Sequence, residues 1–317
     1  MRIVVIGGSG HVGSFLIPRL VNAGHQVISI SRGKRQPYQE HRAWNAVEQI
    51  AVDRELAERN ETFGPQIQTL APDVVIDMIC FSPQSARHLV NALRGKVQHV
   101  LVCGTIWVHG RSIVVPTVEA QKREPFGDYG IQKERMTAYL LQEARLNKFP
   151  VTVLHPGHIV GPGWVPLNPQ GNFNPEVFCT LARGEEFRLP TQGMETLHHV
   201  HADDVAQAFV NALTRWNEAI GEDFHIVSEA AVTLYGYAEA VASWFGNNAT
   251  IRCMAGDLWE EGLSKDDIAA SWEHLLHSPS CSLAKARRLL GYQPRYTSLQ
   301  AIYESVQWLI AHHVIKI

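Results

Sequence analysis

The sequence of 317 residues has no long apolar run, no basic excess and no paired cysteines. Its uncharged apolar stretches are all shorter than the roughly 20 residues of a membrane-spanning helix, so we expect no membrane segment. A formal net charge of −3 without a basic stripe disfavours a nucleic-acid partner. The five cysteines are scattered and form no CxxC pair, which is typical of reduced thiols and not of disulfides or zinc. Because the first expected strand begins at residue 2, we expect no signal peptide and a cytoplasmic protein.

Apolar runs alternate with amphipathic stretches through the N-terminal half. The runs are too apolar to alternate inward and outward, which indicates strands buried on both faces of a parallel sheet. Helices are expected between them, notably over Ser82–Leu93 and Ile131–Leu146. This order predicts an α/β fold with a doubly wound parallel sheet of the Rossmann type. The expected strands are Arg2–Ile6, Gln26–Ile30, Val47–Val52, Asp73–Ile79, Val97–Cys103, Val151–Leu154 and, later, Phe224–Val227.

The alternation of apolar runs and amphipathic stretches ends at about residue 163. Pro, Gly and Asn cluster in Gly163–Pro175, which is typical of a loop, and Leu258–Ala286 reads as helical. We therefore expect a Rossmann domain over residues 1–162, rejoined by about 195–230. Residues 163–194 and 231–317 would then form mainly a smaller, discontinuous C-terminal substrate-binding domain.

A glycine turn follows the first strand and opens a helix. Its spacing is GxxGxxG, and such a turn lets the backbone and the helix N-terminus approach a pyrophosphate. A glycine-rich turn without a ligand is the alternative, and Pro18 lies inside the expected helix. The candidate cofactor-binding residues of the turn are Gly7, Ser9, Gly10, His11, Val12 and Gly13.

The second strand ends in Ser31 and Arg32, followed by further cations. Proteins that prefer NAD place an acid here for the ribose 2′-hydroxyl, whereas cations suit the 2′-phosphate of NADP. This pattern favours NADP and leaves NAD possible. A solvated basic loop is the alternative reading.

Tyr129 stands four residues before Lys133, a spacing that puts both side chains on one helix face. A buried ammonium beside a phenol is expected to lower the phenol pKa from about 10 toward the range of a general base. A YxxxK match by itself is common, so its neighbours in the sequence matter.

Further segments occur in the order of one family. The chain resembles the extended short-chain dehydrogenase/reductases, the NAD-dependent epimerase/dehydratase family, over essentially its whole length. The segments that carry the resemblance are the glycine turn, Cys103–Gly110, the Tyr129/Lys133 pair, His155–Pro162, His201–Ala206 and Lys285–Pro294.

The resemblance implies roles for single residues. Thr105, Tyr129 and Lys133 would be catalytic, and Asp53 and Pro156 would join Tyr129 and Lys133 in cofactor binding. It implies an NAD(P)-dependent oxidoreductase or epimerase that transfers a hydride at a hydroxyl or keto carbon of a carbohydrate-like small molecule. Dehydratase chemistry ranks last, because Ile106 and its neighbour stand where those members carry an acidic pair.

The chain departs from the family at substrate positions. Leu197 replaces an arginine that commonly holds a nucleotide diphosphate, and His155 and His158 replace an arginine and an asparagine, so a UDP-sugar is in doubt. Arg183 and Arg188 lie near in sequence and offer a substitute. The predicted substrate-binding residues are His158, Trp164 and Asn172.

The histidines also suggest a metal, since His199 and His201 share a strand face and His155 and His158 are close by. The fold's chemistry needs no metal, and we predict none; polar pocket lining or hydrogen-bonded core histidines are the expected roles.

A second function class stays open. Ser31–Gly33 and Asp77–Pro83 resemble segments of chloroplast stem-loop RNA-binding proteins, which suggests a non-catalytic NADP-sensing or RNA-binding protein on the same fold. The Thr105/Tyr129/Lys133 set favours an enzyme. The apolar positions of Ile131–Leu146 allow a homodimer, although packing on the sheet also demands some of them.

Overall fold

The computed structural model describes residues 1–248 and 250–317. Its centre is a seven-stranded sheet whose paired neighbours all run parallel, in the order β11-β6-β5-β4-β1-β2-β3. This order confirms the predicted doubly wound α/β sheet. The strands are β1 (Arg2–Ile6), β2 (Gln26–Ser31), β3 (Glu48–Ala51), β4 (Val74–Asp77), β5 (His99–Cys103), β6 (Val151–Pro156) and β11 (Asp223–Ile226).

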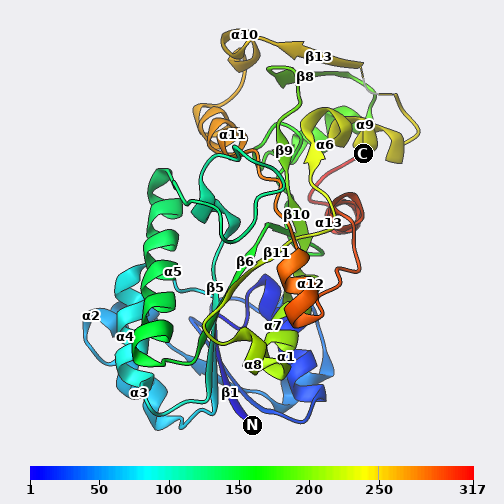
Figure 1. Ribbon diagram of the computed structural model, residues 1–317. Helices are drawn as coiled ribbons and strands as arrows, with labels where there is room; N and C mark the ends of the chain where they lie inside the picture. The colour runs from blue at the N-terminus through cyan, green and yellow to red at the C-terminus, as the bar shows by residue number, and fades with distance from the viewer. Residues whose placement is uncertain (249) are drawn as a thin grey trace.

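Helices cover both faces of the sheet (Figure 1). Alternate residues of β1 enter different cores, as the period of two requires: Ile3 and Val5 face one side, Val4 and Ile6 the other. The first core is closed by α1 (His11–Asn22) and α7 (Ala202–Thr214), and the second by α3 (Phe63–Thr69), α4 (Pro83–Leu93) and α5 (Gly127–Asn147). The short elements at this end of the molecule are η1 (Arg42–Ala46), α2 (Arg54–Arg59), η2 (Ile106–His109), α8 (Trp216–Ala219) and α12 (Ala284–Leu290).

One strand is less buried than the sequence predicts. The apolar stretch Val47–Val52 was expected to be buried, but β3 is the edge strand, and Glu48, Gln49 and Ala51 are exposed. An edge strand has a neighbour on one side only and tolerates polar side chains, which also protect the edge.

A smaller lobe stands above the carboxyl ends of the strands (Figure 1). It has its own apolar core, centred on Phe178, Phe187, Tyr237 and Ile302. Between its segments the chain returns to the sheet through α7 and β11. Its elements are β7 (His158–Val160), α6 (Glu176–Ala182), β8 (Glu186–Pro190), β9 (Thr196–Leu197), β10 (His199–His201), β12 (Val232–Thr233), α9 (Leu234–Trp244), β13 (Thr250–Met254), α10 (Gly256–Glu260), α11 (Lys265–His277) and α13 (Ser298–Ala311).

The helical stretch expected over Leu258–Ala286 is divided among α10, α11 and α12. Gly262, with a φ of 87°, separates the first two, and Pro279 follows the end of α11. The division lets α11 turn toward the sheet, where its C-terminal end reaches the site described below. In the described part of the chain, no helix has the length and apolarity needed to cross a membrane.

Candidate active site

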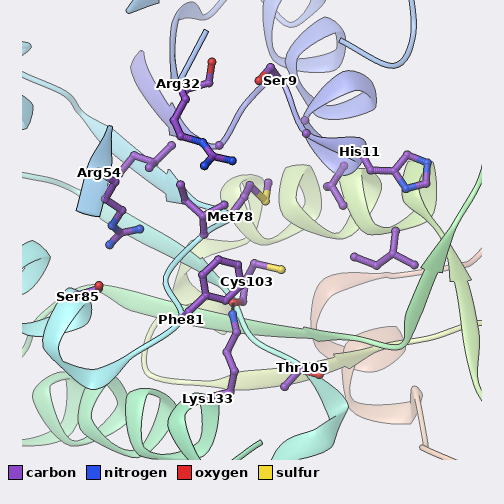
Figure 2. A pocket seen from close by; sticks show the side chains of 18 of the residues that line it. Ser9, His11, Arg32, Arg54, Met78, Phe81, Ser85, Cys103, Thr105 and Lys133 are labelled. Atoms are coloured by element: carbon purple, nitrogen blue, oxygen red, sulfur yellow. Dashed lines mark hydrogen bonds between the residues drawn. The ribbon is translucent and has the colours of Figure 1, made fainter. Parts of the chain in front are cut away.

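A cavity of about 1430 Å³ lies at the carboxyl ends of the central strands (Figure 2). Ligands of open α/β sheets bind at this edge, where the strand order reverses. The predicted residues that line it are Gly7, Ser9, Gly10, His11, Val12, Gly13, Ser31, Arg32, Asp53, Thr105, Tyr129, Lys133, Pro156, His158 and Trp164. Of the predicted site residues, Asn172 alone lies elsewhere.

The glycine turn forms the floor of the cavity. A Cβ on Gly13 would stand 2.0 Å from the carbonyl oxygen of Gly8, so only glycine allows helix and strand to approach this closely. Helix α1 begins after Gly10 with no side chain capping it. Its first N–H groups and the positive end of its dipole therefore face the cavity, an arrangement that suits a pyrophosphate.

His11 and Trp164 close one side of the cavity by stacking. Their ring centroids are 5.1 Å apart at an interplanar angle of 8°, and Tyr38 packs against both rings. Burial, with a smaller contribution from His201, lowers the pKa of His11 to about 4, so this ring is neutral at pH 7. Trp164 thus joins the loop after residue 163 to helix α1, which begins at the glycine turn.

Two arginines reach the cavity from different loops, Arg32 after β2 and Arg54 at the start of α2 (Figure 2). Arg54 pairs with Asp77 at 2.8 Å and with Glu58 at 2.6 Å, and its Nη2 is buried without a partner among the described residues. Asp53, predicted to bind the cofactor, caps α2 by accepting a hydrogen bond from the Leu56 N–H at 3.1 Å.

Arg54 was missed in the sequence, although a signal was present. It directly follows Asp53 at the end of a strand predicted to belong to the sheet, which places it at the ligand-binding edge.

Lys133 is buried at the other end of the cavity, with 1% of its surface exposed. Its ammonium donates hydrogen bonds to the carbonyl oxygens of Cys80 at 2.9 Å and Cys103 at 2.7 Å. The Nζ atom lies 4.6 Å from the Phe81 ring centroid and 5.9 Å from that of Tyr129. In this arrangement Lys133 joins the ends of β4 and β5 to α5.

The expected lowering of the Tyr129 pKa by Lys133 is not found. Burial, aided by Cys103, raises the pKa of Tyr129 to about 12, and a hydrogen bond with Thr105 only partly opposes the rise. The ring packs edge-on against Trp107 at 5.8 Å, yet 42% of the residue is exposed toward the cavity. The ammonium is engaged by two carbonyls instead of the phenol, so Tyr129 carries its proton at neutral pH.

Thr105 is held by a hydrogen-bonded chain that begins at Asp223. The Thr105 N–H donates to His155 Nδ1 at 3.1 Å, and His155 Nε2 lies 3.1 Å from the Asp223 carboxylate. A carboxylate only accepts, so His155 carries its proton on Nε2. A Cβ on Gly104 would come within 2.2 Å of His155 Nδ1, so glycine makes this contact possible.

Charges gather on Asp223 from several elements. Arg123 forms an ion pair with it, and Lys285 Nζ lies 3.7 Å from its Oδ1. Burial opposes ionisation of Asp223, but the hydrogen bond from His155 and the charges of Arg123 and Lys285 hold its pKa well below the usual range. The side chain of His155 therefore holds the backbone of Thr105 in place. Neither His155 nor Asp223 lines the cavity.

Asn172, which was predicted to bind substrate, lies inside the fold and outside the cavity lining. Asn172 is 1% exposed; its Nδ2 donates to Ser271 Oγ at 3.0 Å and its Oδ1 accepts from Asn168 Nδ2 at 2.6 Å. The bond to Ser271 ties the loop after residue 163 to α11, and Oδ1 holds the loop together by accepting from Asn168 and from the Asn174 N–H. A buried asparagine is more often paired within the fold than offered to a ligand.

Neither proposed replacement for the missing phosphate ligand reaches the cavity. Arg183 forms ion pairs with Glu176 and Glu185, and Arg188 lies 3.5 Å from a glutamate of its own strand. Leu197 is fully buried in the core of the smaller lobe.

The four histidines considered for a metal have separate partners. His155 contacts Asp223, His199 contacts the Leu167 carbonyl, His201 contacts Glu304, and His158 faces the cavity. Among the described residues, no group of three or more side chains is placed to hold a metal ion.

His274 was also missed by sequence reasoning. It lines the cavity from α11, which lies far along the chain from the glycine turn and from Thr105, Tyr129 and Lys133. Only the folded arrangement brings it to the site, since it lies 145 residues beyond Tyr129 in numbering and belongs to no recognisable segment.

Comparisons with known proteins agree on the family. The model of the NAD dependent epimerase/dehydratase family matches residues 3–226. A chloroplast stem-loop binding protein of 41 kDa from Arabidopsis thaliana is 25% identical over 96% of this chain and 78% of its own length. A UDP-glucose 4-epimerase from Mycolicibacterium smegmatis is 27% identical over 67% of this chain and 73% of its own.

A solved structure with the same fold is that of UDP-glucose 4-epimerase with UDP-glucose from Thermotoga maritima. It superimposes with a TM-score of 0.74 at 20% identity, covering 99% of this chain and 100% of the other. The strand order, the glycine turn at the cavity floor and the family match lead to one conclusion: this chain belongs to the NAD-dependent epimerase/dehydratase family, the extended short-chain dehydrogenase/reductases.

Proposed function

We propose that the protein transfers a hydride between a bound nicotinamide cofactor and a hydroxyl or keto carbon of a sugar-like small molecule, with Tyr129 as acid/base. The observation that carries the proposal is the placement of Thr105, Tyr129 and Lys133 in the same cavity as the glycine turn. The names of relatives support the class, since they include UDP-glucose 4-epimerase and dTDP-4-dehydro-6-deoxy-D-allose reductase.

The residues present fit a dinucleotide. The uncapped start of α1 suits its pyrophosphate, and the close approach that Gly13 permits leaves room for the backbone to meet it. Arg32 would hold a 2′-phosphate, which favours NADP over NAD, and the unpartnered Nη2 of Arg54 lies on the same side of the cavity. When bound, the nicotinamide supplies or accepts the hydride.

A side chain of the protein donates and accepts the proton. During reduction, the Tyr129 O–H bond breaks and its proton moves to the substrate carbonyl oxygen, as that carbonyl carbon gains the hydride. In the reverse direction the phenolate takes the proton of the substrate hydroxyl as its carbon loses the hydride. Because the pKa of Tyr129 is raised to about 12, the protonated phenol is prepared to act as the acid at neutral pH.

Thr105 and Lys133 position this exchange. The Thr105 hydroxyl accepts from the Trp107 N–H at 3.3 Å, so its own hydrogen can be donated either to the Tyr129 oxygen or to the reacting oxygen. Lys133 fixes the helix turn that carries Tyr129 relative to the ends of β4 and β5. Orientation of this kind lowers the barrier because the reacting groups need no further ordering.

The test starts with cofactor binding. NADPH and NADH are titrated separately and followed by tryptophan fluorescence, since Trp107 and Trp164 line the cavity. A panel of sugars, glycosides and keto-sugars is then added to the loaded protein while the reduced-nicotinamide absorbance is recorded. We expect at least one member of the panel to change the absorbance.

The matched variant is Tyr129→Phe, which keeps the ring and removes the hydroxyl. We expect its rate to fall by about 100-fold or more, as loss of a general acid predicts, with cofactor affinity unchanged. Silence over the whole panel, or equal rates in the two proteins, would contradict the proposal.

A second candidate is a protein that binds RNA on the same fold. The likeness to the chloroplast stem-loop binding protein, over 96% of this chain, is the observation that favours it. The formal net charge of −3 argues against it, because nucleic-acid affinity depends on neutralising phosphates. A gel-shift titration with a stem-loop RNA separates the two: salt-sensitive binding in Tyr129→Phe, without hydride transfer in the parent, would favour RNA.

A further inference from the structure

The cavity beyond Tyr129 is walled by rings. Trp107 meets the Tyr129 ring edge-on at 5.8 Å and the His274 ring at 4.9 Å, and His274 lies 5.3 Å from His158 and 5.6 Å from Phe173. We call these four residues beyond the tyrosine, Trp107, His158, Phe173 and His274, the aromatic end of the cavity.

Trp107 is held rigidly in place. His277 stacks on it at 4.0 Å with an interplanar angle of 15°, and Phe126 stacks on His277 at 4.0 Å. Trp107 is 8% exposed, so most of its surface already packs against the protein. A ligand that meets this ring finds a surface that needs no reordering, which reduces the entropy cost of binding.

The cations of the cavity lie elsewhere. Arg32, Lys34 and Arg35 come from the loop after β2, and Arg54 and Arg59 from α2. Lys133, the remaining cation of the lining among described residues, donates to two main-chain carbonyls. The aromatic end therefore has no arginine or lysine in the described part of the chain.

A diphosphate would be poorly bound at the aromatic end. Burying a charged phosphate without charge-assisted donors is costly, and the side chains there are apolar or imidazole. The family's arginine position is Leu197, which is fully buried in a core, and Arg183 and Arg188 are paired outside the cavity.

The imidazoles show what the aromatic end can bind. His274 Nδ1 lies 2.6 Å from the Ala270 carbonyl, and because a carbonyl only accepts, this nitrogen carries the proton. Burial lowers the pKa of His274, so the ring is neutral and its Nε2 is a bare acceptor. His158 Nε2, for its part, is buried with no partner among the described residues. A ligand is needed that donates hydrogen bonds.

We propose that the aromatic end binds a neutral, non-phosphorylated sugar or glycoside, with one apolar face on the exposed ring of Phe173, against the small exposed part of Trp107, and a hydroxyl donating to His274. This inference rests on the proposed function, because it takes Tyr129 as the reacting group. Stacking of a ring face on aromatic side chains and a hydroxyl-to-imidazole hydrogen bond together match the groups present.

The experiment compares two probes on the NADP⁺-saturated protein by calorimetry: phenyl β-D-glucoside and UDP-glucose. Saturation with cofactor prevents the nucleotide from occupying the cofactor region. We expect phenyl glucoside to bind at least tenfold more tightly than UDP-glucose. Equal or tighter binding of UDP-glucose, or no binding of phenyl glucoside, would overturn the proposal.

Variants identify the contact. His274→Leu should weaken phenyl glucoside binding about tenfold, His274→Gln should restore part of it because its side-chain oxygen also accepts, and His313→Leu, an exposed histidine outside the cavity, should change nothing. Thermal unfolding checks that each variant folds. Equal affinity in His274→Leu and the parent would remove the assigned contact.

The two proposals fail separately. If UDP-glucose binds tightly and is oxidised in a Tyr129-dependent way, the substrate class is wrong and hydride transfer stands. If phenyl glucoside binds through His274 and no substrate exchanges a hydride, the binding site stands and the proposed function falls.

Discussion

His155 donates a hydrogen bond from Nε2 to the Asp223 carboxylate at 3.1 Å, while its other nitrogen accepts from the backbone of Thr105. Asp223 stands at the start of β11, in a part of the chain that returns to the sheet after about 120 residues of separation from Thr105 in numbering. The loop that carries Thr105 is therefore held in place, through His155, by a residue of a strand that comes late in the chain.

Asp223→Asn should destabilise the protein by about 3 kcal/mol, because the largely buried Arg123 would keep its charge without a carboxylate partner. Urea unfolding at neutral pH measures the loss. The neighbouring Glu222→Gln is the control: its pair with Lys285 is half exposed and should contribute less than about 1 kcal/mol. Equal losses of unfolding free energy in the two variants would show that the buried carboxylate stabilises the protein no more than the exposed one.

Lys133→Met should lower the free energy of unfolding by about 2 kcal/mol, since the carbonyls of Cys80 and Cys103 would be buried without a donor. The methionine side chain keeps much of the volume. Lys96→Met, at an exposed position, is the matched control. A stability unchanged within error would mean that water replaces the ammonium.

Arg32→Ala should weaken NADPH binding about tenfold and NADH binding less than threefold, because only NADPH carries the 2′-phosphate. Fluorescence titration gives both dissociation constants. Arg42→Ala, an exposed arginine outside the cavity, should affect neither. A similar loss for both cofactors would assign Arg32 to the part that they share.

Asn172→Ala should destabilise the protein by about 2 kcal/mol while leaving cofactor affinity unchanged, because its partners Asn168 and Ser271 lie within the fold. Thermal unfolding and NADPH titration separate the two effects. The exposed Asn217→Ala is the control. Weaker cofactor binding without lower stability would show that Asn172 takes part in ligand binding.

Acid should unfold the protein steeply between pH 6.5 and 4. Burial is the largest cause that lowers the pKa of a set of histidines. Below pH 6.5 these histidines therefore bind protons in the unfolded chain and stay neutral in the folded chain. Stability is complete above pH 6.5 and falls as the pH decreases, by about 1.4 kcal/mol per pH unit for each such histidine. The set is His109 and His199, with pKa lowered to about 3, and His11, His99, His198 and His277, lowered to about 4.

The slope can be checked with single substitutions. Replacing buried His199 by Gln should reduce the slope of the unfolding free energy against pH, below pH 6, by about 1.4 kcal/mol per pH unit. This change in slope is expected whatever the effect of the substitution on stability at pH 7. His313→Asn, at an exposed position, should leave the slope unchanged. Parallel curves for parent and His199→Gln would show that this histidine does not couple folding to pH.

The sequence by itself determined the doubly wound sheet and the family. Buried strands of parallel sheets are continuous apolar runs, and a glycine turn must sit within a few residues of the strand and helix that it joins, so both signals are local. The YxxxK spacing likewise places Tyr129 and Lys133 on one face of a helix, because residues four apart are neighbours on a helix surface.

Only the tertiary structure decided how side chains are used. Asn172 is engaged within the fold, Lys133 donates to carbonyls and not to the phenol, and His155 supports Thr105. His274 reaches the cavity from a helix far along the chain. Hydrogen-bond partners and burial depend on contacts between residues distant in sequence, and spacing along the chain carries no information about them.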